Sequence, residues 1–494
     1  MEGVFFISFF FVSIALSLFA HKTKLMALGD FIYQKLCRLL QHTPTGCQER
    51  LFLQFADYMV SDQTDELFVV NGYAGTGKTT AVGAIVKLMD QTKGKVVLMA
   101  PTGRSAKVLS SHTQKPAYTI HKTIYREKNR GSASAHFVID FNPHKDTLFI
   151  VDEVSLIANQ SSESTLFGTG RLLDDVVTYV RSGVGNRLFL MGDAAQLPPV
   201  GLLLSPALDP VALAAYGTFR YVEMKSVVRQ AADSGVLHNA TLLREKISAG
   251  AEGFPALALK GFPDVRNICG GELLDQLQEA YDRYGAAETV VLCRSNKRAN
   301  RYNQGIRAKI LFSEEQLTRG DRVMVVKNCY QFLEEVSDDL PFIANGDVAE
   351  VVRIGNHTKR YGLHFAVATL RFSDYNNLEI NAKVMLDTLF LETPSLGSER
   401  QGQLFSEILL DYAHIRGRRK QVMAVKEDAY FNALQLKYAA AITTHKAQGG
   451  QWKAVFVDYA FFGNAHHTVE DLRWFYTAFT RATEVLYLVN FPLI

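Results

Sequence analysis

Short apolar runs recur along the chain and predict buried strands. Three of them lie in the first half, at Leu67–Val70, Leu148–Val151 and Leu188–Met191. Continuous runs of this length are typical of parallel strands that are covered on both faces. The segment Thr80–Met89, which follows the first run, has its apolar residues at helical spacing instead. Strands that alternate with helices predict an α/β fold.

The second half of the chain repeats this alternation. An apolar strand is predicted at Thr289–Cys293, and a helix follows at Asn296–Ile310. Further strands are predicted at about Leu434–Ile442, Ala454–Val457 and Val485–Asn490. The two sets of elements predict two α/β lobes that follow one another along the chain.

Two segments interrupt these lobes with patterns typical of β-structure. Residues 110–145 contain Tyr125–Arg130, a Gly131-Ser132 turn and an alternating stretch that ends at Ile139. This pattern predicts a β-hairpin that extends from the first lobe. Residues 318–432 contain short apolar stretches separated by Gly, Asn and Asp turns, which predicts a small β-barrel inserted in the second lobe.

The N-terminal residues differ from the rest of the chain. Val4–Ala20 is almost wholly apolar and is followed by His21, Lys22 and Lys24. A secretory signal would require Lys or Arg before this stretch, and none is present. Its length of about 17 residues is the short limit for a membrane span. We favour an upstream extension from a misassigned start, with Met26 opening the natural chain; a membrane anchor and a cleaved signal are the alternatives. A cytoplasmic protein without membrane attachment is therefore expected.

Composition excludes several classes of protein without choosing a function. The 494 residues are 48% hydrophobic and 21% charged, which is typical of globular domains rather than disordered chains. Lys and Arg number 53 against 50 Asp and Glu, so any site for a polyanion must be local. The five cysteines are scattered without a CxxC pair, which indicates thiols in a reducing compartment rather than a zinc or disulfide framework.

One glycine-rich loop carries the strongest chemical signal. Residues 72–79 read Gly-Tyr-Ala-Gly-Thr-Gly-Lys-Thr and lie between a predicted strand and a predicted helix. This matches the phosphate-binding loop G-x-x-x-x-G-K-[ST], in which backbone N–H groups and the lysine hold phosphates and the hydroxyl ligates Mg²⁺. The candidate nucleotide-binding residues in this loop are Gly72, Gly75, Thr76, Gly77, Lys78, Thr79 and Thr80. ATP and Mg²⁺ are the predicted cofactors.

Two carboxylates follow the second predicted strand. Asp152 and Glu153 stand where a parallel strand opens onto its ligand crevice. We assign Asp152 to the Mg²⁺ side of the site together with Thr79, and Glu153 to orienting the attacking water. An acidic doublet alone is weak evidence, but its position after a phosphate-binding loop makes this pair a candidate for catalysis.

The motifs that follow resemble one family in their order. The third predicted strand runs into Gly192-Asp193-Ala194-Ala195-Gln196-Leu197-Pro198-Pro199, and the other motifs are Pro101-Thr102-Gly103-Arg104, Thr119-Ile120-His121, Thr443-Thr444-His445-Lys446-Ala447-Gln448-Gly449 and Tyr476-Thr477-Ala478-Phe479-Thr480-Arg481-Ala482. From about residue 45 to its end, the chain resembles superfamily 1 DNA helicases of the RecD-like, 5′-to-3′ branch. Ala447 and Val154 depart from common residues of that pattern, and neither change removes a reactive group.

The resemblance implies roles around the nucleotide. Gln48 is similar to the glutamine that reads adenine, although Gln54 is close by and an ordinary glutamine on a helix surface is the alternative. Gln196 is similar to the residue that contacts the γ-phosphate. Arg229 and Arg481 resemble the two arginines that reach the γ-phosphate from the second lobe, where a permanently charged guanidinium suits the charge on the phosphoryl oxygens. Ordinary surface arginines are the alternative for both.

The resemblance also implies a track for single-stranded DNA. Thr102, His121, Thr443 and His445 match positions that contact the DNA backbone, where hydroxyl and imidazole groups bond phosphates without reading bases. A buried structural histidine is the alternative for His121. Gln448 is close enough in the motif to couple the track to ATP, and that is the only role we assign to it.

The expected architecture is an α/β fold with two RecA-like P-loop NTPase lobes, a β-hairpin insertion in the first and a small β-barrel insertion in the second. After an extension at 1–25, the first lobe spans 26–220 and includes the insertion 110–145; the second comprises 221–317 and 433–494, around the barrel at 318–432. The resemblance implies that the hairpin splits duplex DNA and that the barrel clamps the strand. A plain surface hairpin is the alternative.

The expected activity is that of an ATP-dependent DNA helicase that moves 5′ to 3′ on single-stranded DNA and unwinds duplex DNA. Single-stranded and duplex DNA are the expected partners, together with repair or recombination proteins. Two alternatives remain: the motor subunit of an exonuclease complex, and a nucleotide-gated DNA clamp that does not unwind.

Overall fold

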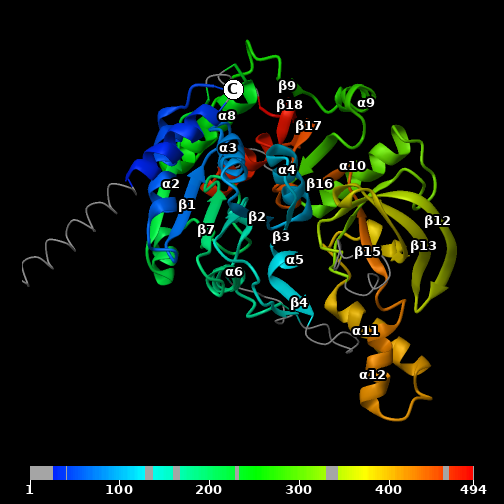
Figure 1. The fold of residues 1–494 in the computed structure, drawn as a ribbon. Helices are drawn as coiled ribbons and strands as arrows, with labels where there is room; N and C mark the ends of the chain where they lie inside the picture. The colour runs from blue at the N-terminus through cyan, green and yellow to red at the C-terminus, as the bar shows by residue number, and fades with distance from the viewer. Residues whose placement is uncertain are drawn as a thin grey trace, which may run out of the picture.

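A computed structural model describes residues 26–40, 42–127, 137–159, 167–228, 233–329, 343–459 and 467–492. These residues form two α/β lobes and a β-barrel that carries a pair of helices (Figure 1). The predicted fold class is confirmed. No helix within these ranges is long and apolar enough to cross a membrane; the predictions for residues 1–25 lie outside them.

The first lobe is built on a parallel sheet of six strands. Their order is β3 (Ala117–Thr119), β2 (Lys95–Ala100), β6 (Thr147–Val151), β7 (Arg187–Gly192), β1 (Leu67–Gly72) and β8 (Phe219–Met224). The central strands β1, β6 and β7 are buried along their whole length, which explains why their sequences are continuous apolar runs rather than alternating ones.

Helices cover both faces of this sheet and form two separate cores. They are residues 26–39, α2 (Gly46–Val60), α3 (Lys78–Gln91), α4 (Gly103–Thr113), α5 (Ile120–Ile124), α6 (Leu172–Arg181) and α7 (Pro210–Leu213), with 3₁₀ turns η1 (Val154–Leu156) and η2 (Ala214–Tyr216). One core joins α2 and α3 to one face of the sheet, and the other joins α5 and α6 to the opposite face. Alternate side chains of β1 enter the two cores, as the pleat requires.

The second lobe has a parallel sheet of five strands. Their order is β16 (Ala441–Thr443), β10 (Thr289–Cys293), β17 (Trp452–Asp458), β18 (Ala482–Val489) and β9 (Val265–Ile268). The helices that pack on it are α8 (Gly235–Ser248), α9 (Leu273–Tyr284), α10 (Asn296–Lys309) and α13 (Val469–Phe479), and η6 (Thr444–Ala447) follows β16. Several fully buried aromatic residues of this lobe lie on α13 and include Trp474 and Phe475.

The barrel is closed by five strands. They are β11 (Arg322–Val325), β12 (Val348–Arg360), β13 (Leu363–Phe372), β14 (Leu378–Met385) and β15 (Leu434–Tyr438), with η4 (Ser373–Tyr375) and η5 (Leu386–Phe390) between strands. The barrel therefore continues beyond residue 432, because β15 pairs with β14 and β11. The apolar stretch 434–442 is divided between two sheets, since β16 belongs to the second lobe.

The two insertions differ from their expected extents. Residues 110–124 belong to α4, β3 and α5 of the first lobe, so only β4 (Tyr125–Glu127) and β5 (Phe137–Ile139) pair as a hairpin. Most of the expected tip, at residues 128–136, lies outside the described residues. The barrel carries two helices that strand patterning did not predict, α11 (Ser398–Asp411) and α12 (Arg418–Glu427).

Candidate functional site

The glycine-rich loop connects β1 to α3 in the geometry that its sequence predicts. Gly75 and Gly77 have φ values of 73° and 79°, in the left-handed region that glycine enters at little cost. A Cβ on Gly72 would lie 2.5 Å from Cγ of Lys78. The stem of Lys78 therefore passes directly over Gly72, and its ammonium contacts the Gly72 carbonyl oxygen.

A buried carboxylate faces this lysine. Asp193 follows β7, the strand that pairs with β1, so the two loops open at the same edge of the sheet. Its Oδ2 atom lies 3.7 Å from Nζ of Lys78, and its side chain is 1% exposed. Asp193 was not among the predicted site residues. The signal was nevertheless in the sequence, because it follows an apolar strand in the same way as Asp152.

Asp152 and Glu153 occupy the neighbouring strand end, after β6. The Glu153 N–H donates to Oδ1 of Asp152 at 2.7 Å. Burial and the charge of Glu153 raise the pKa of Asp152 to about 7, while Lys78 acts to lower it. Glu153 itself has a φ of 53°, a conformation that is uncommon for a residue with a side chain and that recurs at functional sites.

The donors at this edge fit a nucleotide-bound Mg²⁺. Within the described ranges, no three His, Cys, Asp or Glu side chains converge as a metal cluster. Mg²⁺ that accompanies a nucleotide is typically held by one or two protein oxygens, with phosphate oxygens and water completing the shell. The hydroxyl of Thr79, in the first turn of α3, and the carboxylate of Asp152 are of this kind. Their assignment stays a prediction.

Gln48 lies beside the phosphate-binding loop. Its Oε1 atom accepts the N–H of Thr45 at 3.0 Å in a capping box at the start of α2. Its Nε2 atom is buried and has no hydrogen-bond partner within the described chain, and a Cβ on Gly77 would lie 2.5 Å from it. A buried amide donor without an acceptor is costly, and the ring nitrogens of adenine are suitable acceptors. Gln48 therefore holds an unused donor beside the phosphate-binding loop, and its contact with adenine stays a prediction.

Helix α13 of the second lobe reaches across to both loops. The Tyr476 hydroxyl accepts the N–H of Ala74 at 2.8 Å and donates to Oδ2 of Asp193 at 2.6 Å. The next residue of the helix, Thr477, accepts the N–H of Leu197 at its Oγ1 atom, at 2.8 Å. Tyr476 therefore links the glycine-rich loop to the loop after β7 through a side chain from the other lobe.

Two further side chains of the second lobe hold residues 194–197. Arg473 donates to the carbonyl oxygen of Ala194 and, at 3.3 Å, to that of Gln196. Nε2 of Gln448 donates to the Leu197 carbonyl at 2.6 Å, which supports its predicted coupling role. Oε1 of Gln196 is buried without a hydrogen-bond partner among the described residues. A carbonyl oxygen accepts from a donor such as water and does not bond a phosphate oxygen, so the contact of Gln196 with the γ-phosphate stays a prediction.

Arg481, one of the two predicted arginines, contacts its own lobe. Arg481 is 4% exposed, and its guanidinium donates to the Thr477 and Gly450 carbonyls at 3.0 and 3.2 Å. These acceptors belong to the second lobe itself. Arg229 lies outside the described residues. The arginine of this region that contacts the first lobe is Arg473, which sequence reasoning missed because only its contact across the lobes distinguishes it.

Thr102 lies where the two lobes meet. Its hydroxyl caps α4 by accepting the N–H of Ser105 at 3.1 Å. A Cβ on Gly449, which has a φ of 72°, would overlap Oγ of Ser105. Arg104 of the same helix donates to the Gln451 carbonyl at 2.9 Å, and its guanidinium lies 3.9 Å from the ring centroid of Trp452. The start of α4 therefore rests on the segment that follows η6.

The other track candidates have different surroundings. His121 stacks edge-on against Phe167, with a centroid distance of 4.8 Å. Burial lowers the pKa of His121 to about 4, so its imidazole is neutral at physiological pH and packs as a structural histidine does. Thr443 is buried at the end of β16, whereas His445 is exposed on η6.

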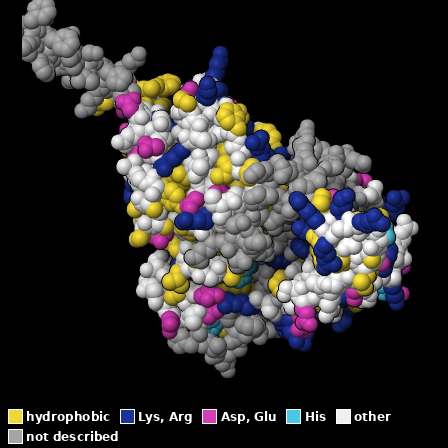
Figure 2. Space-filling view, turned by 90° about the horizontal axis from the view of Figure 1, so that it is seen from below, with side chains coloured by type: hydrophobic (Ala, Val, Ile, Leu, Met, Phe, Trp, Pro, Cys, Tyr) yellow, Lys and Arg dark blue, Asp and Glu magenta, His cyan; other side chains and the backbone are white. Residues whose placement is uncertain are grey.

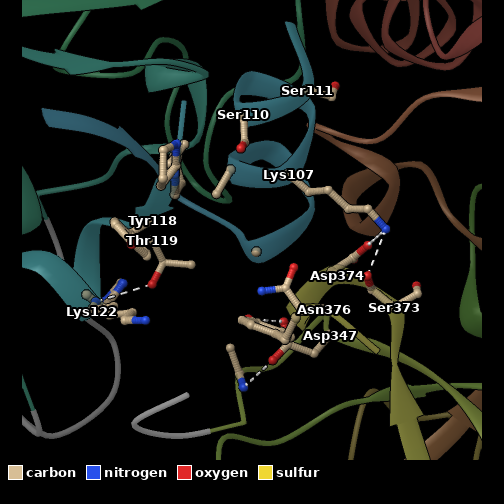
Figure 3. Close-up of a pocket in the computed structure, with 18 of the residues that line it drawn as sticks. Lys107, Ser110, Ser111, Tyr118, Thr119, Lys122, Asp347, Ser373, Asp374 and Asn376 are labelled. Carbon is tan, nitrogen blue, oxygen red and sulfur yellow. Dashed lines mark hydrogen bonds and ion pairs between the residues drawn. The ribbon is translucent and has the colours of Figure 1, made fainter. Parts of the chain in front are cut away.

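A cavity of about 580 Å³ lies between α4, β3 and α5 on one side and the barrel on the other (Figure 3). His121 lines it, as do Pro101 and Gly103 on either side of Thr102; Thr443 and His445 do not. Lys107 of α4 joins its two sides, because Nζ of this lysine lies 3.1 Å from Oδ1 of Asp374 in η4.

An aromatic and a basic side chain are among those that line this cavity. Tyr118 is 41% exposed, and Nζ of Lys122 lies 4.5 Å from its ring centroid. Tyr375 of the barrel donates to Oδ1 of Asp347 at 3.0 Å on the opposite wall. An exposed ring beside cations is the combination that binds the bases and phosphates of a single strand.

Comparison with known proteins identifies both lobes. Residues 55–262 match a family described as AAA domain, and residues 438–489 match the UvrD-like helicase C-terminal domain. The ATP-dependent RecD2 DNA helicase of Deinococcus radiodurans is 31% identical over 174 residues, which cover 35% of this chain and 21% of the relative. The multifunctional conjugation protein TraI of Escherichia coli is 29% identical over 130 residues, covering 24% and 7%. The chain thus matches about a fifth or less of the length of these relatives.

A Pif1 helicase from Bacteroides was solved with ADP-AlF3 and single-stranded DNA, and it matches this chain with a TM-score of 0.45 at 16% identity. The match covers 92% of this chain and 94% of the Pif1 chain. The matched families occur in the chain order of the motifs, with the phosphate-binding loop in one and Tyr476 to Arg481 in the other. The resemblance to superfamily 1 helicases of the RecD-like branch, which the motifs indicate, is confirmed by the two family matches and the RecD2 relative.

Proposed function

We propose that this chain is an ATP-dependent DNA helicase that moves 5′ to 3′ along single-stranded DNA and unwinds duplex DNA as it advances. One observation carries most of the argument: Tyr476 bonds both the phosphate-binding loop and Asp193 from the opposite lobe. A nucleotide bound at Lys78 therefore lies at a junction between lobes. Opening and closing such a junction is the motion that a translocating motor requires.

The residues of the first lobe have distinct roles in hydrolysis. Lys78 binds the β- and γ-phosphates, and Glu153 orients the attacking water. Mg²⁺, held by Thr79 and Asp152, would neutralise charge on the phosphate oxygens. Gln196 contacts the γ-phosphate, and loss of that phosphate changes the loop 194–197 that Arg473 and Gln448 hold.

The second half of the proposal concerns DNA. The cavity that His121 lines lies between the first lobe and the barrel, so a strand inside it would contact two domains. Thr102 belongs to the helix that rests on the segment after η6. A change in lobe spacing therefore moves α4 relative to Gly449 and shifts any strand bound there.

The test uses the full-length chain with ATP and Mg²⁺ on duplexes that bear either a 5′ or a 3′ single-stranded tail. Unwinding confined to the 5′-tailed duplex, and absent in Lys78→Ala, is the expected result. Lys87→Ala is the matched control, because Lys87 is exposed on the same helix. Unwinding of the 3′-tailed duplex alone would overturn the polarity. DNA-stimulated hydrolysis without unwinding would favour the clamp, or a motor that requires the other subunits of an exonuclease complex.

A further inference from the structure

Helices α11 and α12 form a hairpin inserted between β14 and β15, and in Figure 1 they extend below the barrel, clear of the two lobes. The hairpin is fixed to the barrel by an apolar cluster of its own. That cluster contains Leu404, Ile408, Leu409 and Val425 of the helices with Leu363, Phe365, Met385 and Ala433 of the barrel and its approach. The hairpin is therefore an extension of the barrel that moves with it.

The far end of this hairpin is strongly basic. Arg416, Arg418, Arg419 and Lys420 are all exposed, and we call these four residues the basic tip. Among the described residues, no carboxylate lies within 4.0 Å of any of the four. Figure 2 views the molecule from below and shows Lys and Arg side chains gathered at the right, where α11 and α12 lie in Figure 1.

Three acidic residues in or beside the hairpin have other partners. Asp411 accepts from Arg360 at 2.7 Å, and Oε2 of Glu407 lies 3.3 Å from Arg400. Asp428 accepts the hydroxyl of Tyr412 at 3.0 Å. Asp411 is thus paired with the barrel, Glu407 within α11 and Asp428 with the residue that follows α11. None of these three carboxylates lies within 4.0 Å of a cation of the basic tip.

The tip also opposes the electrostatics of its own helix. Three of its cations lie in the first turn of α12, which contains no acidic residue, and the N-cap Gly417 supplies no side-chain acceptor. The N-terminus of a helix is the positive end of its dipole, so cations there destabilise it and an anion stabilises it. The arrangement lowers the stability of the isolated protein and favours a bound polyanion.

We propose that the basic tip binds the phosphate backbone of duplex DNA; this inference rests on the proposed helicase function. Duplex DNA carries about one charge per 1.7 Å of axis, and unpaired Lys and Arg side chains bind it by releasing counterions, whatever its sequence. The tip lies at the end of a projection, whereas the cavity suited to a single strand lies between α4 and the barrel. A duplex still joined to the bound strand is therefore the polyanion that the tip meets.

The test compares Arg418→Ala/Arg419→Ala/Lys420→Ala with the full-length parent chain. Binding is measured by fluorescence anisotropy across a salt series, on a single strand and on the same strand joined to a duplex. The salt slope is the steepness with which the logarithm of the binding constant falls with the logarithm of the salt concentration. We expect this slope for the joined duplex to decrease in magnitude by roughly 2 to 3, about 0.9 per lost phosphate contact. Affinity for the single strand and its stimulation of ATPase stay unchanged. The melting temperature of the variant rises, because the helix loses unfavourable charges.

The charge-matched control is Lys87→Ala/Lys246→Ala/Lys260→Ala, which removes three cations from α3, α8 and the loop after α8 and leaves both slopes unchanged. Arg419→Glu provides a second variant with one exposed substitution. Equal losses on both DNAs would place the tip in the single-strand track, and no loss on either would remove nucleic acid as its partner. If the triple variant lost binding to vesicles of anionic lipid but kept its binding to DNA, the partner of the tip would be a membrane. Each of these outcomes overturns the inference.

The parent chain separates this inference from the proposed function. If single-stranded DNA fails to stimulate ATP hydrolysis by the parent chain, the helicase proposal fails whatever the tip does. If that stimulation is present and the duplex slope is insensitive to the tip, only the present inference fails.

Discussion

Tyr476 donates a hydrogen bond of 2.6 Å to Asp193 across the junction of the two lobes. The same hydroxyl accepts the N–H of Ala74 at 2.8 Å. Burial and the charge of Asp193 raise the pKa of Tyr476 well above its usual value, so the phenol stays protonated and continues to donate. One side chain of the second lobe thus contacts both of the loops that lie at the nucleotide-binding edge of the first lobe.

Tyr476→Phe is expected to separate nucleotide binding from turnover. The substitution keeps the ring packed but leaves the buried Asp193 without this donor, which costs about 1–3 kcal/mol of stability. DNA-stimulated ATP hydrolysis falls, while binding of a fluorescent nucleotide analogue is retained. Tyr487→Phe is the control, since that ring stacks on Phe456 in the core of the same lobe. Equal turnover by the two variants would show that the hydroxyl has no coupling role.

Arg481→Ala is expected to retain nucleotide binding and to lose turnover by roughly 10³-fold or more, as removal of an arginine finger does. In the present arrangement its guanidinium bonds the Thr477 and Gly450 carbonyls, so the variant also melts at a lower temperature. Turnover is therefore measured well below that temperature, and with Arg481→Lys alongside. If activity simply followed the folded fraction, Arg481 would be a structural residue and not a catalytic one.

Gln48 and Thr45 form a matched pair. Thr45→Ala removes the cap of α2, which costs about 1 kcal/mol, and leaves the unpaired Nε2 of Gln48 in place. Gln48→Ala removes both the cap partner and the amide. We expect only Gln48→Ala to reduce the preference for ATP over pyrimidine nucleotides, as measured by competition for a fluorescent analogue. A similar loss in both variants would assign Gln48 to capping alone.

Asp347 is expected to make stability depend on pH. Burial raises its folded-state pKa from 3.8 to about 7, with Asp374 adding to the shift and Tyr375 and the Ala344 N–H opposing it. Between these values the folded chain binds more protons than the unfolded chain, so this group lowers stability as pH rises from about 4 to above 7. Lys107 is the cation that faces Asp374 across this interface.

The substitution Asp347→Asn tests this linkage. It removes the titrating group and keeps an oxygen that can accept the Tyr375 hydroxyl. We expect the variant to melt above the parent chain at pH 8, with the difference shrinking toward pH 5. Thermal melts across that range provide the measurement. A difference that stays constant with pH would show that Asp347 is not the titrating group.

The sequence by itself determined the parts that depend on neighbouring residues. Continuous apolar runs are buried strands, so β1, β6, β7 and β10 occur where the pattern predicts them. The glycine-rich loop needs only a strand before it, a helix after it and glycines at positive φ, and residues 72–79 encode all three. Asp152 and Glu153 follow from the rule that parallel strands open onto a common edge.

Tertiary structure decided everything that depends on contacts between distant segments. The stretch 434–442 reads as one apolar strand, yet β15 closes the barrel and β16 joins the second lobe, because pairing partners and not composition assign a strand to its sheet. Arg481 is held by its own lobe while Arg473 reaches the first. Arg473 lies on α13, whose residue Tyr476 also meets Asp193, whereas Arg481 follows the end of that helix. Residue type alone does not distinguish the two arginines, because the packing of α13 against the first lobe decides which of them reaches across.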